Sequence, residues 1–141
     1  MWGLHEYWVA TGKRWARAAA NRTAELFLEH RLFRSLETGE PIHPSWVVAH
    51  YPPFWHYDVL QVLLILSRMG KADDTRTADG IDLLLDSQRP NGRWNKGPAW
   101  WRPPDSAGSN VEVVDWGARG PSEMITLNAL RILRAAGRLT I

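Results

Sequence analysis

Hydrophobic positions along the chain follow the 3.6-residue spacing of α-helices over several segments. In most of them the opposite face carries charged side chains, which predicts helices that are half in water. One segment, residues 54–69, is apolar nearly all round, which is typical of a buried helix. We therefore expect an all-α chain with main helices near 14–33, 54–69, 75–88 and 121–136, preceded by a helical stub at 4–11.

An internal repeat relates the predicted buried helices. When the chain is shifted by 67 residues, Leu60–Gly70 lies on Leu127–Gly137 with leucines, an isoleucine and the final glycine in common. Gly12, Gly70 and Gly137 then close three helices at the same position, as glycine commonly does. Each unit has an outer, half-exposed helix followed by an inner, buried one, and it needs neighbours to cover the inner helix. The units are residues 13–70 and 71–138, with 1–12 as the tail of a preceding unit.

The predicted helix at 75–88 ends in the run Q-R-P-N-G-R-W, which has the form Q-x3-G-x-W. Gln88 can hydrogen-bond backbone groups left free at a helix end, Gly92 turns the chain, and Trp94 lays a large aromatic face over the junction. This run resembles the QW repeat of the terpenoid cyclases, such as the squalene–hopene cyclases. Their fold is shared more loosely with the β-subunits of protein prenyltransferases.

The resemblance implies that residues 1–141 form a single partial α/α-toroid domain of about two outer–inner helix pairs plus the stub. Such a fragment leaves inner helices uncovered. We therefore expect further copies of this chain, in a homo-oligomer, or the remainder of a longer chain to cover them. Any small-molecule ligand would be apolar and isoprenoid-like, and we expect no catalysis by this segment alone.

The residues that perform the chemistry of the resembling enzymes are not found here. Class II cyclases protonate their substrate with a D-x-D-D motif, whereas Asp73 and Asp74 stand alone and are better interpreted as a helix cap. Prenyltransferases hold zinc with Asp, Cys and His. The chain has no cysteine and no histidine pair at ligand spacing, so we expect no metal site and no cofactor.

Polar residues near the starts of the inner helices are the remaining catalytic candidates, because resembling proteins place their working groups there. We favour the alternative that Asp58 and Glu123 cap free backbone donors. The catalytic candidates are His56, Asp58, Asp115 and Glu123, in a wider polar set that adds His50, Tyr51, Tyr57 and Glu112.

Nine tryptophans are an unusual number for 141 residues. Four of them, Trp55, Trp100, Trp101 and Trp116, are candidates to line an apolar binding cavity, since aromatic faces also stabilise cations. Packing at helix junctions is the favoured role for these four, as it is for Trp94.

Composition and charge limit the class of protein and the partners that we expect for it. A 45% hydrophobic and 23% charged chain is ordinary for a globular domain. A net charge of +2, with arginines spread along helices, argues against nucleic acid as a partner. No run approaches the roughly 20 apolar residues of a membrane span. The N-terminus lacks the basic-then-apolar order of a signal peptide, so a cytoplasmic protein is expected.

Two other functions compete with the cyclase-like one. The first is a non-catalytic helical-repeat scaffold that binds a partner through its inner-helix surface. The second is a carbohydrate-acting α/α toroid, in which tryptophans stack on sugars and two carboxylates, Asp115 and Glu123, carry out acid–base chemistry. The Q-x3-G-x-W spacing favours the terpenoid-cyclase resemblance over the carbohydrate-acting toroid.

Overall fold

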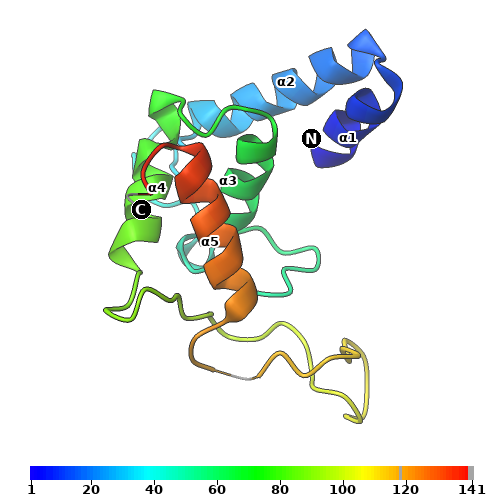
Figure 1. Cartoon of the computed structure of the whole chain (residues 1–141), viewed down its shortest axis with the longest axis vertical. Coiled ribbons are helices and arrows are strands. Elements are labelled where there is room, and N and C mark those ends of the chain that lie inside the picture. Colours follow the sequence, from blue (N-terminus) through cyan, green and yellow to red (C-terminus); the bar gives the residue numbers. More distant parts are fainter. Residues whose placement is uncertain (118, 140–141) are drawn as a thin grey trace.

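The computed structural model describes residues 1–117 and 119–139, and within them all regular structure is helical (Figure 1). Pairing of extended segments is limited there to isolated β-bridges, so the predicted all-α class is confirmed. The α-helices are α1 (Trp2–Thr11), α2 (Arg14–Glu29), α3 (Val59–Arg68), α4 (Ala78–Asp86) and α5 (Glu123–Ala135), with 3-10 turns η1 (Pro44–Val47) and η2 (Thr75–Thr77).

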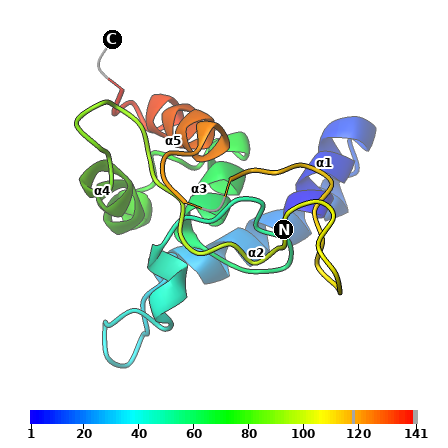
Figure 2. The same ribbon diagram turned by 90° about the horizontal axis from the view of Figure 1, so that it is seen from below.

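Helices α3 and α5 form the centre of the fold. They pack side by side and run in the same general direction, as expected for the two inner helices (Figure 1). Viewed from below, α3 occupies the middle of the molecule with α2, α4 and α5 around it (Figure 2). Each of the two carries five buried residues, against four on α2 and three on α4. Those five are Val59, Leu60, Val62, Leu63 and Leu66 on α3, and Ile125, Asn128, Ala129, Ile132 and Leu133 on α5.

The two predicted outer helices are half exposed, as their patterns indicate. Helix α2 buries a stripe of small residues every fourth position, ending in Leu28. It stops at Glu29, before the predicted end at residue 33. The reason is that Arg31 and Leu32 take left-handed backbone angles, with φ of 43° and 74°. Arg31, which lies inside the predicted helix range, is instead exposed beyond the helix end.

The starts of the inner helices also differ from the prediction. Helix α3 begins at Val59 and not at residue 54, because Phe54 has a φ of 46° and Asp58 caps the helix. Helix α5 begins at Glu123, since the hydroxyl of Ser122 accepts the Ile125 N–H at 3.3 Å as the cap. Pro121, predicted as the first helical residue, therefore precedes the helix.

Gly12, Gly70 and Gly137 share one backbone conformation, with φ of 68°, 70° and 67°. The carbonyls of the last helical turn are satisfied in the same way at two of these ends. Lys71 N–H donates to the Leu66 carbonyl at 2.9 Å, and Arg138 N–H donates to the Leu133 carbonyl at 2.8 Å. This is the six-residue closure that a left-handed glycine permits. The two closures lie 67 residues apart, which is the shift of the sequence repeat.

Helix α4 approaches α3 closely at Gly80, which is buried. A Cβ atom added there would lie 2.8 Å from Cδ1 of Leu32 and 3.0 Å from Cγ2 of Val59. The glycine therefore allows two helices to meet without a side chain between them, an approach that the hydrophobic pattern did not indicate.

The Gln88–Trp94 turn closes the end of α4 as a packed unit. Trp94 is 1% exposed and donates its indole N–H to the carbonyl of Leu84 at 2.6 Å, so its predicted burial against this helix is confirmed. Gly92 turns the chain with a φ of 76°. The Gln88 amide donates to the Gly92 carbonyl at 3.3 Å, within the turn, instead of to the groups at a helix end that we had predicted.

Candidate functional site

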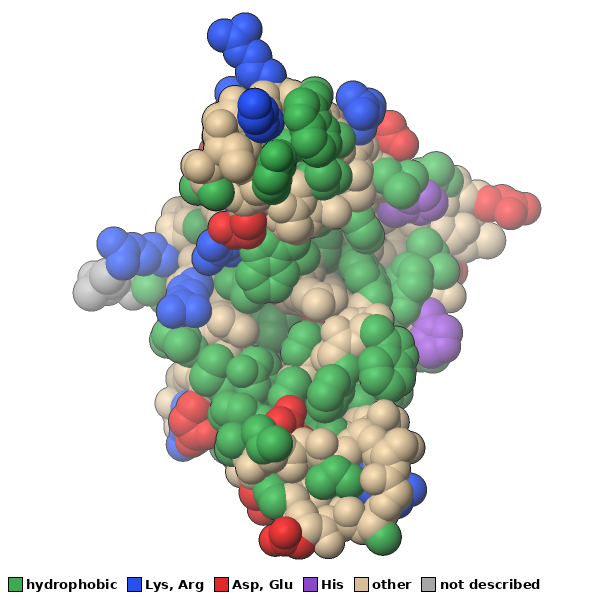
Figure 3. Space-filling model, turned by 90° about the vertical axis from the view of Figure 1, so that its right-hand side faces the viewer, with side chains coloured by type: hydrophobic (Ala, Val, Ile, Leu, Met, Phe, Trp, Pro, Cys, Tyr) green, Lys and Arg blue, Asp and Glu red, His purple; other side chains and the backbone are tan. Residues whose placement is uncertain are grey.

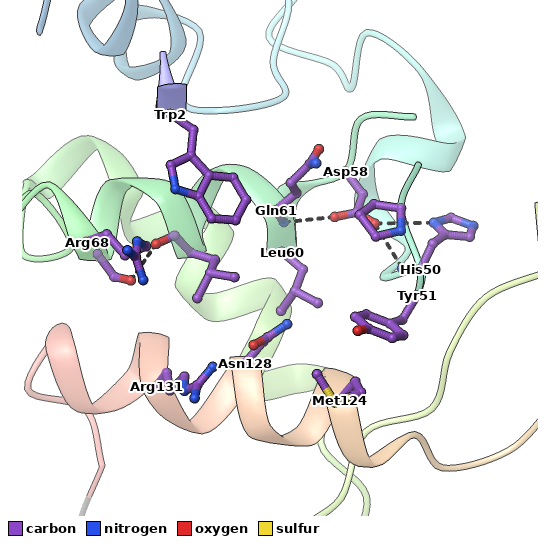
Figure 4. A pocket seen from close by; sticks show the side chains of 13 residues that line it. Trp2, His50, Tyr51, Asp58, Leu60, Gln61, Arg68, Met124, Asn128 and Arg131 are labelled. Carbon is purple, nitrogen blue, oxygen red and sulfur yellow. Dashed lines mark hydrogen bonds and ion pairs between the residues drawn. The ribbon is translucent and has the colours of Figure 1, made fainter. Parts of the chain in front are cut away.

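A groove of about 710 Å³ opens between α3, α5 and the start of α1, with the segment before α3 at one end (Figure 4). That size lies within the range of small-molecule sites. Its lining comes from helices far apart in sequence, and comprises Trp2, His50, Tyr51, Pro53, Asp58, Leu60, Gln61, Leu64, Ser67, Arg68, Met124, Asn128 and Arg131.

Apolar side chains form the floor of the groove. Leu60 and Leu64 lie one turn apart on α3 and share a face, while Met124 comes from the first turn of α5. The indole of Trp2, 40% exposed, stands over this floor at the mouth (Figure 4). On the side of the molecule that lies to the right in Figure 1, hydrophobic side chains gather around a hollow (Figure 3). The groove therefore offers an apolar body with polar groups at its edges.

Asp58 marks one end of the groove and is 2% exposed. One carboxylate oxygen accepts the backbone N–H of Gln61 at 2.9 Å, and the other accepts the backbone N–H of His50 at 2.9 Å. The His50 ring lies on the far side of Asp58, with Nδ1 3.4 Å from the carboxylate and Nε2 against Gly97. Both oxygens thus hold the start of α3 in place, which agrees with the capping role favoured for Asp58.

The opposite end of the groove is basic. Arg68 donates to Glu6 from Nη2 at 2.6 Å and from Nε at 2.8 Å, and the indole N–H of Trp2 donates to the same carboxylate at 2.8 Å. These contacts tie α1 to α3. The hydrogen bond from Arg68 holds the pKa of the Glu6 carboxyl below its ordinary value, so Glu6 is charged and balances Arg68.

The four candidate tryptophans lie away from the groove lining. Trp55 is 71% exposed. The other three pack among the loops before α3 and after α4. His56 stacks on Trp100 at 3.8 Å between ring centroids, and Trp116 meets Tyr51 edge-on at 5.0 Å. Trp101 donates its indole N–H to the Tyr51 carbonyl at 3.3 Å. His56 is thereby placed in the loop cluster and not in the groove.

The remaining acidic candidates, Asp115 and Glu123, are exposed and have local partners. Asp115 accepts the backbone N–H of Gly117 at 2.8 Å. Glu123 forms an ion pair with Arg93. The backbone N–H of Glu123 itself, at the start of α5, and then Arg93 lower the pKa of its carboxyl. Neither carboxylate lines the groove.

Of the groove lining, sequence reasoning had singled out only His50, Tyr51 and Asp58 as candidates. The polar or aromatic residues that it missed include Trp2, Gln61, Asn128 and Arg131. One signal could have found two of them, because Gln61 and Asn128 occupy the same position in the 67-residue repeat and both carry a primary amide. Trp2 and Arg131 had no such signal. Their role depends on how α1 and α5 pack against α3.

No protein-family model, no curated protein and no solved structure matches the chain. The resemblance to terpenoid cyclases thus depends on the residues of the Gln88–Trp94 turn and of the repeat.

Among residues 1–117 and 119–139, no helix has the length and apolar character needed to cross a membrane. In the same ranges, no three His, Asp or Glu side chains are grouped closely enough to hold a metal ion.

Proposed function

We propose that this chain is a segment of an α/α toroid resembling the terpenoid cyclases and prenyltransferases, and that its groove binds an apolar, isoprenoid-like molecule without transforming it. The observation that carries the proposal is the groove itself, whose floor is built from the inner helices α3 and α5. The pairing of these helices, their shared glycine ends and the buried Trp94 support the toroid arrangement.

The chemistry of the groove supports binding over catalysis. Asp58 is the carboxylate at its inner end, and both of its oxygens accept backbone hydrogen bonds. Protonation of Asp58 would weaken those bonds and loosen the start of α3, so it is poorly suited to serve as the acid of a cyclase. The indole of Trp2 lies over the apolar floor and adds apolar contact area at the mouth of the groove, which favours binding of an apolar ligand.

Binding of farnesol, followed by thermal shift and calorimetry on the whole chain, tests the proposal. We expect farnesol to raise the melting temperature, whereas maltotriose leaves it unchanged. Trp2→Ala should weaken farnesol binding because it removes the indole at the mouth. Trp15→Ala is the matched control, since Trp15 is 61% exposed and lies outside the groove.

The opposite ranking, with maltotriose bound and farnesol not, would favour the carbohydrate-acting alternative. Binding of neither compound would refute the proposal.

A scaffold that binds other protein chains is the second candidate function, and the exposed apolar residues favour it. Val113 is 87% exposed and Leu127, on the inner helix α5, is 41% exposed. Leu127 corresponds in the repeat to Leu60, which lines the groove. A further copy of the chain, or another part of a longer one, packed on α5 would cover Leu127. Crosslinking of a Leu127→Cys variant to a second copy would support this function.

A further inference from the structure

The α5 side of the groove carries an amide and a guanidinium three residues apart. Asn128 is 8% exposed, and its side chain makes no hydrogen bond with the described residues. In Figure 4 its amide points across the groove toward Leu60. Arg131 lines the same groove, as expected from a spacing of three, and forms no ion pair in the part of the chain that is described.

Because the Asn128 amide faces the groove and has no protein partner among the described residues, a ligand in the groove can form a hydrogen bond with it without breaking an existing contact. The charged groups elsewhere in the groove are already engaged. Asp58 holds two backbone N–H groups, and Arg68 is neutralised by Glu6. Asn128 and Arg131 lie about one turn apart on α5 and remain available to a ligand, as do the side-chain amide of Gln61 and the hydroxyl of Tyr51, which also line the groove.

We infer that the apolar ligand of this groove carries a single carboxylate, bound by the side-chain amide of Asn128 and the guanidinium of Arg131. This inference rests on the proposed function, which places an apolar chain over Leu60 and Leu64. The amide N–H and the guanidinium N–H groups donate, and the two carboxylate oxygens accept. A guanidinium presents its donors in a planar fork that matches a carboxylate.

The charge of the groove favours a carboxylate over a phosphate. Since Glu6 balances Arg68, Arg131 contributes a positive charge without an ion-pair partner, and the Asp58 carboxylate at the other end of the groove disfavours a ligand with more than one negative charge. A carboxylate brings one negative charge and two oxygens, whereas a phosphate ester brings nearly two charges and three strongly accepting oxygens. One arginine and one amide suit the smaller head group.

Calorimetric titration of the whole chain with farnesoic acid and with farnesol tests the inference, since the two ligands differ only in the head group. We expect the acid to bind about ten-fold tighter or more, as a hydrogen bond to a charged group contributes on that order. Arg131→Gln should remove this preference, because the acid should lose much more affinity than farnesol. Arg131 is exposed, so the substitution does not threaten the fold.

Two further variants sharpen the test. Asn128→Asp keeps the shape of the side chain but adds a negative charge, so it should reverse the preference in favour of farnesol. Arg134→Gln is the matched control, because Arg134 is exposed on α5 one turn from Arg131 and outside the groove lining. It should retain the full preference for the acid.

The outcomes separate this inference from the function on which it rests. Equal affinity for the acid and the alcohol, or an undiminished preference in Arg131→Gln, would overturn the carboxylate assignment while the apolar groove still stands. Tighter binding of farnesyl phosphate than of the acid would also overturn it. Failure of all farnesyl compounds to bind would refute the proposed function as well.

Discussion

The indole N–H of Trp94 donates to the carbonyl of Leu84, 2.6 Å away, across the end of α4. Trp94 is 1% exposed, and its ring belongs to the same hydrophobic core as Leu63 and Ile132. The Leu84 carbonyl lies near the helix end, where helical N–H partners are missing, and it also accepts the Ser87 hydroxyl at 2.9 Å. One side chain therefore both closes α4 and joins it to the inner helices.

Replacing Trp94 with Ala should reduce the free energy of unfolding by about 3–5 kcal/mol, because it leaves a cavity in the core. Urea unfolding measures the change. Trp55→Ala is the control, since Trp55 is 71% exposed, and it should stay within about 0.5 kcal/mol of the wild type. If Trp94→Ala changed the free energy of unfolding as little as the control does, the Trp94 side chain would not contribute to the core.

Gly70→Ala should destabilise the chain by about 1–2 kcal/mol, the typical cost of a left-handed backbone for a residue with a Cβ. No atom lies within 4 Å of the added Cβ, so the cost comes from the φ of 70° and not from a clash. Gly137→Ala should cost a similar amount, because its φ is 67°. Thermal unfolding with Gly3→Ala as control checks this.

Gly3 lies within α1 with open space around it, so an added methyl group should not destabilise the chain there. Unequal costs at Gly70 and Gly137 would argue that the two helix ends are not equivalent.

Asp74 gives the fold a defined acid sensitivity. A side-chain hydrogen bond from Arg76 lowers the pKa of the Asp74 carboxyl to about 2, against about 4 in unfolded chains. Because the folded pKa is the lower one, the ionised carboxylate stabilises the fold above about pH 4, and this contribution is lost as the pH falls toward about 2. The difference in stability between wild type and Asp74→Asn should therefore shrink over that window.

Unfolding followed at several pH values measures the effect, with Asp73→Asn as control. Asp73 is the exposed neighbouring carboxyl and has no ion pair among the described residues. A wild-type to Asp74→Asn difference that is independent of pH would show that the Arg76 contact does not contribute.

The uncovered apolar surface should drive self-association of the isolated chain. Leu127 and Val113 remain exposed, and hydrophobic side chains surround the hollow on one side of the molecule (Figure 3). Large contiguous apolar patches usually mark interaction sites. We expect light scattering at micromolar concentration to detect oligomers. A monodisperse, cooperatively melting monomer of 16.1 kDa would contradict this expectation.

The local features of the fold could be predicted from sequence because each depends on residues within a few turns. The period of the apolar residues placed the helices, and glycines marked the ends of α1, α3 and α5. The Q-x3-G-x-W spacing indicated that Trp94 packs on α4. The starts were harder to place, since caps such as Asp58 and Ser122 depend on backbone angles outside the helix.

The candidate site depended on contacts between residues far apart in sequence. From the sequence, Asp58 was both a catalytic candidate and a candidate helix cap. In the structure one of its oxygens accepts the Gln61 N–H and the other accepts the His50 N–H, so both oxygens are occupied. In the sequence Asn128 was one of several polar residues on α5, and only the packing of α5 against α3 showed that it is buried beside the groove.

The sequence by itself determined which segments form helices, where three of them end and which face of each is apolar, because helix periodicity and chain reversal are local properties. Only the tertiary structure decided that Trp2, Leu60 and Asn128 line one groove, while three of the four candidate tryptophans pack among loops and Trp55 is exposed. The physical reason is that a groove is the space left between packed helices. Its lining is set by distances between side chains of different helices, and no spacing along the chain records them.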